Sequence, residues 1–138
     1  MRFVICGSMA FAKEMLDIKK FLEDAGHSVM VPYNAEKFVS GEFAPESSVE
    51  AAQKKIAGNL VQEYFLEIKA ADAVIVANYE KKGIKNYIGG NSFLEAGFAH
   101  VLDKKLYFIN DIPEMIYSDE LRAFRPIILD EDLKKIFL

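Results

Sequence analysis

The strongest constraint on the fold is the continuous apolar run Ala73-Val74-Ile75-Val76-Ala77. An uninterrupted apolar run of this length, rich in β-branched residues, predicts a strand that is buried on both faces. Phe3-Val4-Ile5-Cys6 and Leu106-Tyr107-Phe108-Ile109 have the same character. Strands buried on both faces are typical of parallel sheets with helices on each side, so the chain is expected to belong to the α/β class.

The order of the elements makes this expectation more specific. After the first strand, apolar residues recur at helical spacing until Gly26, which is placed as a C-cap glycine: Phe11, Met15, Ile18, Phe21 and Leu22. Ser28 to Pro32 then supplies a second strand, parallel to the first by a right-handed crossover. Further on we expect a loop from Tyr33 to Pro45, a helix from Ser47 to about Ala70 and a last short strand at Pro126 to Leu129. The prediction is a three-layer sandwich with a flavodoxin-like parallel five-stranded sheet in the order 2-1-3-4-5.

Length and composition limit the classes of protein that fit. The 138 residues predict one domain, 1–138, large enough to bury about 70% of the surface of its unfolded chain. No apolar run approaches the ~20 residues of a membrane helix. Met1 leads directly into a strand without a signal-peptide pattern, and one cysteine permits no internal disulfide, so we expect a cytoplasmic protein.

Charge and histidine placement argue against two kinds of partner. The net charge of −4, with lysines only in short local groups, disfavours nucleic acid binding. His27 and His100 show no metal-ligand spacing with each other or with the acids, so we expect no metal site.

One acid interrupts the most apolar helical stretch. From Phe93 to Leu102 nearly every side chain is apolar, yet the run contains Glu95. Two explanations fit. Ser92 as N-cap with Glu95 three residues later has capping-box spacing, which would occupy the carboxylate locally. Alternatively, the Gly89-Gly90-Asn91 loop lets a ligand reach the helix start, where the dipole keeps Glu95 ionised and nucleophilic.

The segment Ser92-Phe93-Leu94-Glu95-Ala96-Gly97-Phe98-Ala99 resembles the signature of the nucleoside 2-deoxyribosyltransferase family, including the related 2′-deoxynucleoside 5′-monophosphate N-glycosidases. The resemblance extends more weakly from the first strand to about Asn110. It implies that Glu95 is the nucleophile that attacks C1′ of the deoxyribose, and that Asn91 or Ser92 beside Gly90 orients the sugar. It also implies a homo-oligomer that needs no cofactor.

One position departs from the resembled family. An Asp is expected eight residues before Asp72, and Tyr64 stands there. A phenol with a pKa near ~10 is mostly protonated at neutral pH and would handle a proton on the leaving base only weakly. This departure favours an alternative function, a nucleotide-binding protein without turnover.

The turn after the first strand, Cys6-Gly7-Ser8-Met9, is the candidate binding site for a phosphate or a 5′-hydroxyl. Ligands of such folds lie beyond the carboxyl ends of the strands, Gly7 would let the backbone come close, and Ser8 offers a hydroxyl. A plain turn with Ser8 as N-cap is the structural alternative. The related glycosidases carry an arginine after a similar turn, whereas Ala10 and Phe11 stand here.

Two polar residues follow later strands at the same edge. Asn78 follows the Ala73–Ala77 run and is a candidate for a sugar or base contact, with turn capping as the equal alternative. Asp111 follows the Leu106–Ile109 run and is a candidate second acid or a surface acid.

The function predicted from the sequence is cleavage or transfer of the N-glycosidic bond of deoxyribonucleosides or their 5′-monophosphates. A ribonucleotide N-glycosidase is a further alternative, because Gly89-Gly90-Asn91-Ser92 matches the loop of that family with one residue missing.

Overall fold

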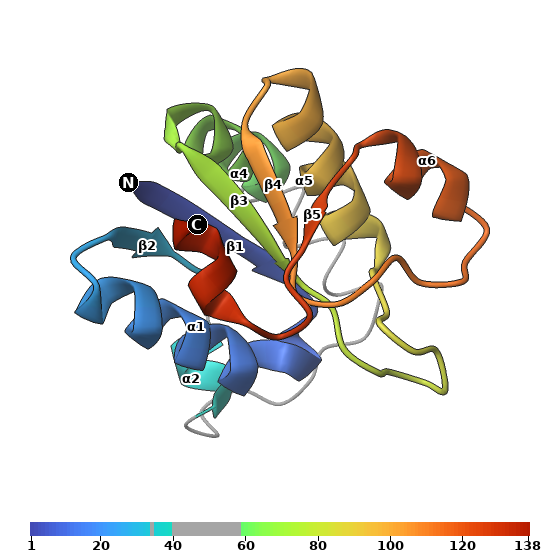
Figure 1. Cartoon of the computed structure of the whole chain (residues 1–138), viewed down its shortest axis with the longest axis horizontal. Coiled ribbons are helices and arrows are strands. Elements are labelled where there is room, and N and C mark those ends of the chain that lie inside the picture. The colour runs from blue at the N-terminus through green and yellow to red at the C-terminus, as the bar shows by residue number, and fades with distance from the viewer. Residues whose placement is uncertain (34, 40–58) are drawn as a thin grey trace.

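The computed structural model describes residues 1–33, 35–39 and 59–138. In this part of the chain a single parallel sheet runs in the order β2-β1-β3-β4-β5 (Figure 1). Its strands are β1 (Arg2–Gly7), β2 (Ser28–Met30), β3 (Ala73–Ala77), β4 (Lys105–Phe108) and β5 (Ile127–Ile128). The predicted fold class and strand order are confirmed.

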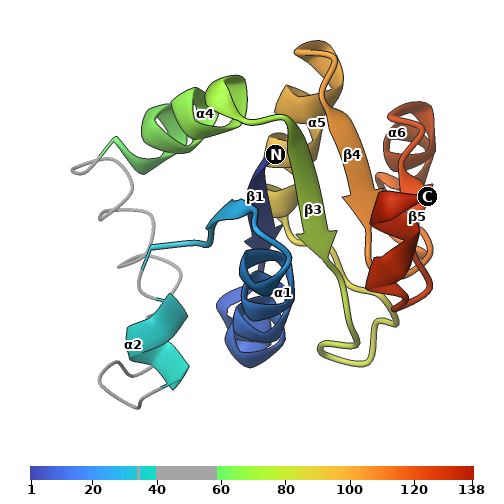
Figure 2. The ribbon, with the colours of Figure 1, turned by 60° about the vertical axis from the view of Figure 1, so that its left-hand side comes forward.

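Helices cover both faces of this sheet. They are η1 (Met9–Phe11), α1 (Ala12–Asp24), α2 (Ala35–Val39), α4 (Leu60–Ala70), α5 (Gly90–Val101), α6 (Ser118–Ala123) and η2 (Leu133–Phe137). Figures 1 and 2 show α1 and the C-terminal η2 on one face, with α4 and α5 on the other. The three layers follow from the strands, whose side chains alternate between two apolar surfaces that both need a cover.

Strand β1 shows how each face obtains its core. Phe3 and Ile5 point into a cluster with the buried side of α1 and with Ile136 of η2. Val4 and Cys6 point the other way, into a cluster with residues of α4, α5 and α6. Each residue from Phe3 to Cys6 is fully buried, as the continuous apolar run predicts.

The first helix ends where the sequence predicts. Gly26 has φ +90°, and its N–H and that of His27 bond back to the carbonyls of Glu23 and Leu22 at 2.9 and 3.1 Å. Glycine adopts this left-handed conformation without the steric cost of a Cβ atom. The chain therefore turns sharply from α1 into β2.

Two predicted segments differ from the structure or lie partly outside it. The expected loop from Tyr33 to Pro45 contains the short helix α2, and its residues 34 and 40–45 lie outside the described ranges. Of the long helix expected from Ser47, the structure describes α4, which begins at Leu60 after Asn59 with φ 52°. Residues 47–58 lie outside the described ranges.

Register places two loops side by side at the carboxyl edge of the sheet. Cys6 pairs with Val76, and Gly7 pairs with Ala77. The segments that start at Ser8 and at Asn78 therefore leave the sheet as neighbours, at the edge where α/β proteins of this kind bind ligands.

Candidate functional site

Glu95 lies in the second turn of α5 and not in its cap. The N-cap is Gly89, without a side-chain hydrogen bond, and the Phe93 N–H already bonds the Gly89 carbonyl at 2.9 Å. Ser92 is consequently the third residue of the helix, 4% exposed. The predicted capping box of Ser92 and Glu95 is wrong, because the helix starts at the glycine pair instead.

The Glu95 side chain reaches the carboxyl end of β1. There it hydrogen-bonds the thiol of Cys6, which is fully buried on the face covered by α4 and α5. Burial raises the pKa of the Cys6 thiol, and the charge of Glu95 raises it further. The thiol is therefore protonated at neutral pH and donates to the carboxylate. Glu95 itself is partly exposed, so the residue is not sealed in the core.

Tyr64 from α4 completes the group. Its hydroxyl donates a hydrogen bond to the carbonyl oxygen of Ile5 and lies beside the Cys6 side chain. Burial raises the pKa of Tyr64 well above its usual value, and the nearby Cys6 and Glu95 act in the same direction. Glu95 thus has two protonated neighbours, a thiol and a phenol. Tyr64 stands where the resemblance implies an Asp, and it offers a neutral hydroxyl in place of a base.

Packing explains Gly7 without a ligand. A Cβ atom built on this glycine would lie 2.9 Å from Met15 Sδ and 3.1 Å from the Ala77 carbonyl oxygen. The first distance is shorter than real Cβ contacts and the second is tighter than most of them, so a side chain at this position would force Met15 or β3 to shift. The close approach of α1 and β3 to the end of β1 is therefore a structural reason for glycine at position 7.

Ser8 has two roles in the turn that follows. As N-cap of η1 its Oγ accepts a hydrogen bond from the Ala10 N–H at 3.2 Å. The same oxygen accepts a second bond, at 2.8 Å, from the ammonium of Lys81. Met9, the first residue of η1, is half-buried beside it. The N-cap role is confirmed, and the Lys81 contact adds a positive charge to the predicted anion-binding turn.

Lys81 is a candidate residue that the sequence reasoning missed. It lies in the loop between β3 and α5, where Lys81 and Ile84 form a small antiparallel bridge around Gly83 at φ +77°. Its ammonium also lies 5.2 Å from the centroid of the Tyr87 ring. Lys81 and Ser8 are 73 positions apart in the chain, and only the parallel pairing of β1 with β3 brings their loops together.

Asn78 is fully buried and its amide is engaged by backbone. The Nδ2 group donates to the carbonyls of Asn110, Asp111 and Asn86 at 2.9, 3.1 and 3.4 Å, and Oδ1 accepts from the Asn110 N–H at 2.9 Å. These bonds fasten the loop after β3 to the segment after β4. They favour the structural alternative for Asn78 over a substrate contact.

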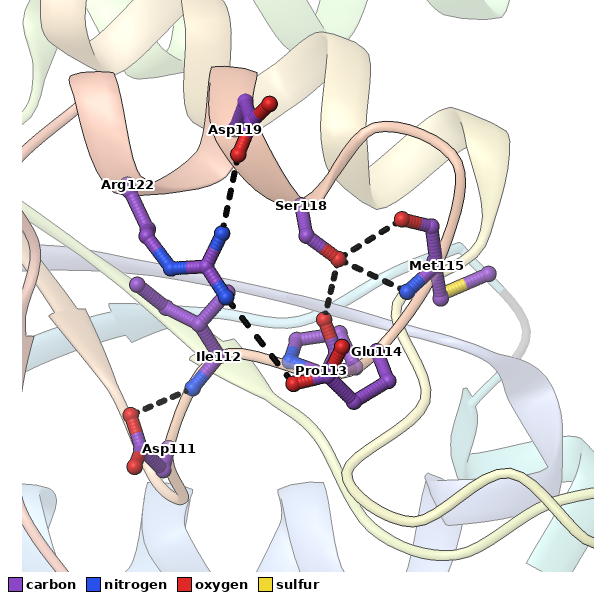
Figure 3. Close-up of polar contacts among 8 residues, drawn as sticks. All are labelled: Asp111, Ile112, Pro113, Glu114, Met115, Ser118, Asp119 and Arg122. Atoms are coloured by element: carbon purple, nitrogen blue, oxygen red, sulfur yellow. Dashed lines mark hydrogen bonds and ion pairs between the residues drawn. The ribbon is translucent and has the colours of Figure 1, made fainter.

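The Asp111 carboxylate hydrogen-bonds the backbone of its own loop. Its Oδ1 accepts a hydrogen bond from the Ile112 N–H at 2.7 Å, as Figure 3 shows. Further along, the Ser118 hydroxyl donates to the Pro113 carbonyl at 2.6 Å and accepts from the Met115 N–H at 2.7 Å. The segment between β4 and α6 is thereby held in a defined conformation, and Asp111 belongs to its exposed surface.

The remaining predicted residues lie at the start of α5 and differ in their exposure to solvent. Gly90 and Asn91 are exposed, and no heavy atom lies within 4 Å of a Cβ built on Gly90. This open space is consistent with the approach of a ligand. Ser92 is turned into the protein and lies below the surface.

Two surface hollows lie away from Glu95. One, of about 330 Å³, is lined by residues of α1, β2 and α2, including Lys19, Val31 and Glu36. The other, of about 240 Å³, lies between the loop containing Gly83 and the segment Ile112–Glu114. Neither is lined by Glu95 or Ser8, so the candidate site is defined by its side chains at the strand ends.

No protein-family model matches the chain, and no curated protein is similar to it in sequence. In the described ranges, no group of three or more His, Cys, Asp or Glu residues is placed to hold a metal ion. Nor does any helix of those ranges have the length and apolar character to cross a membrane.

Proposed function

We propose that this protein cleaves or transfers the N-glycosidic bond of deoxyribonucleosides or their 5′-monophosphates, with Glu95 as nucleophile. One observation carries the proposal. Glu95 lies in the second turn of α5, beyond its N-cap, and meets Cys6 and Tyr64 at the carboxyl end of β1. A carboxylate at the ligand-binding edge of an α/β sheet, in a sequence that resembles the deoxyribosyltransferase signature, supports a role in chemistry.

The reaction would proceed in two steps. A Glu95 oxygen forms a bond to C1′ while the C1′–N bond breaks, and the base leaves with that electron pair and takes a proton from water. The resulting glycosyl ester is then opened at C1′ by water, which yields the free sugar, or by the nitrogen of a second base, which yields a new nucleoside. The Cys6 thiol would hold the carboxylate in position through the hydrogen bond it donates.

A second candidate is a nucleotide-binding protein without turnover. The Tyr64 hydroxyl is committed to the Ile5 carbonyl, and burial raises its pKa, so it cannot accept a proton at neutral pH. An enzyme that relies on a base at that position would be inactive. Binding without base release is the behaviour expected of this candidate.

The deciding experiment incubates the protein with a panel of deoxynucleosides and deoxynucleoside 5′-monophosphates, each with and without a free base, and separates the products by chromatography. Base release alone identifies a hydrolase, and exchange of bases identifies a transferase. Glu95→Gln should abolish both reactions. Binding of a panel member without turnover by the unmodified protein would support the second candidate instead.

The resemblance also leads us to propose a homo-oligomer in the cytoplasm. Analytical ultracentrifugation of the purified protein tests the homo-oligomeric state directly. A monomer at micromolar concentration would contradict it.

A further inference from the structure

Lys81 differs from the other paired lysines in what surrounds its charge. Lys13, Lys19 and Lys20 each form an ion pair with a carboxylate. Lys81 is partly buried, and its partners are the neutral Ser8 hydroxyl at 2.8 Å and the face of Tyr87 at 5.2 Å. No carboxylate in the described part of the chain pairs with it. Burial lowers the pKa of Lys81, as expected for a cation whose lost hydration is not replaced by an anion.

The hydrogen bonds of Ser8 leave its own hydroxyl proton available to a ligand. A hydroxyl has two acceptor lone pairs and one proton. The lone pairs of Ser8 receive the Ala10 N–H and the Lys81 ammonium. The remaining proton forms no hydrogen bond with the described residues, and Ser8 is partly exposed, so a ligand can reach it. A ligand that accepts a hydrogen bond and carries negative charge would satisfy Ser8 and Lys81 together, and a phosphate oxygen has both properties.

The position of this pair relative to Glu95 suggests which part of a substrate it takes. Cys6, which contacts Glu95, and Ser8 are two residues apart, roughly 7 Å along an extended chain. We propose that Lys81 and Ser8 form an anion-binding pair that receives the 5′-phosphate of the substrate and selects monophosphates over nucleosides. The identity of the phosphate as a sugar phosphate rests on the proposed function. The anion site itself rests on the two residues alone.

Binding of 2-deoxyribose 5-phosphate and of 2-deoxyribose, measured by isothermal titration calorimetry, tests this without any need for turnover. The two probes share the sugar and differ in the phosphate ester, which also holds the sugar as a five-membered ring, so the lysine variants below are needed to isolate the phosphate contact. We expect the phosphate ester to bind at least about 10-fold more tightly, the worth of a hydrogen bond to a charged group. Lys81→Met should remove that difference, whereas the neighbouring control Lys82→Met should largely keep it.

Three further measurements complete the test. Ser8→Ala should also weaken the binding of 2-deoxyribose 5-phosphate. Urea unfolding of each variant checks that the fold is retained. Equal affinity of the two sugars, or equal losses in Lys81→Met and Lys82→Met, would overturn the proposal. Inorganic phosphate serves as the sugar-free probe: Lys81-dependent binding of it supports the anion site. If that binding is present and no base is released from any nucleotide, the proposed function fails while the anion-binding pair stands.

Discussion

Tyr64 on α4 donates a hydrogen bond to the carbonyl oxygen of Ile5 in β1, across 59 positions of the chain. The bond fastens the helix to the end of the strand that also carries Cys6, and α5 packs against both elements. It therefore fixes the distance between two of the three elements that meet at Glu95. The bond also explains why a phenol can occupy this position: its proton has an acceptor inside the fold.

Replacing Tyr64 by Phe should lower the free energy of unfolding by about 1 kcal/mol, because the ring keeps its packing while one partly buried hydrogen bond is lost. Urea unfolding followed by circular dichroism measures the change. Tyr33→Phe is the matched control, since Tyr33 is 72% exposed, and it should change stability by less than about 0.5 kcal/mol. Equal effects of the two substitutions would contradict the structural role of Tyr64.

The contact between Cys6 and Glu95 predicts a coupled titration. Burial is the largest cause of the raised pKa of Cys6, and the charge of Glu95 and the hydrogen bond to it raise that pKa further. Glu95→Gln removes the charge, so the pKa of the thiol should fall towards its ordinary value. The chain has one cysteine, so ¹³Cβ labelling gives a single resonance to follow against pH. Glu67→Gln is the control of equal charge change, and a Cys6 pKa that is unchanged by Glu95→Gln would show that the two side chains do not meet.

Loss of the nucleophile predicts a large kinetic effect. We expect Glu95→Gln to lower kcat for base release by at least about 1,000-fold, as removal of a nucleophile does in other enzymes that form covalent intermediates. Asp111→Asn should leave the rate nearly unchanged, because Asp111 is exposed and bonds its own loop. Base release is measured by chromatography on the substrate that the panel identifies. A Glu95→Gln variant of normal activity would refute the nucleophile assignment.

The sheet could be predicted because its signals are local and strong. The uninterrupted apolar runs at Phe3–Cys6 and Ala73–Ala77 have one physical solution, burial on both faces, and helical spacing between strands leads to parallel pairing. Glu95 was conspicuous for a similar reason, as an acid in an apolar helix. Such features depend on neighbours in sequence, and the fold preserves them.

The remaining parts of the site depend on contacts between distant segments. The sequence predicts the start of α5 three residues late, because Ser92 has the side chain of a good N-cap, whereas the observed N-cap, Gly89, makes no side-chain hydrogen bond. The pairing of Lys81 with Ser8 has no signature in sequence, since it follows from the register of β1 against β3. The sequence predicts a ligand contact at Gly7, and the structure adds a packing reason that only the approach of Met15 and Ala77 reveals.

The hydrogen bonds of Asn78 predict a stability effect. Asn78→Ala would leave the Asn110 N–H without its buried acceptor and remove the two N–H groups of Nδ2 that neighbouring carbonyls share. We expect the free energy of unfolding to fall by about 3 kcal/mol, because unsatisfied buried groups cost about 1–3 kcal/mol each. Asn91→Ala, at an exposed position of α5, is the control and should change little. A stable Asn78→Ala variant that has lost only ligand affinity would favour the substrate contact instead.

The environment of Lys81 predicts how phosphate binding depends on pH. Burial, with a smaller contribution from Lys82, lowers the pKa of Lys81 below the ordinary 10.5, and a bound phosphate would raise it again. Affinity for 2-deoxyribose 5-phosphate should therefore be full below the pKa of the free protein and fall as the pH rises through it. Calorimetry from pH 7 to 10.5 measures this fall with the phosphate dianionic throughout, since its second pKa is about 6. Lys82→Met removes a neighbouring positive charge, so the loss of affinity should move to higher pH in this variant. An affinity that stays constant from pH 7 to 10.5 would exclude Lys81 from the phosphate site.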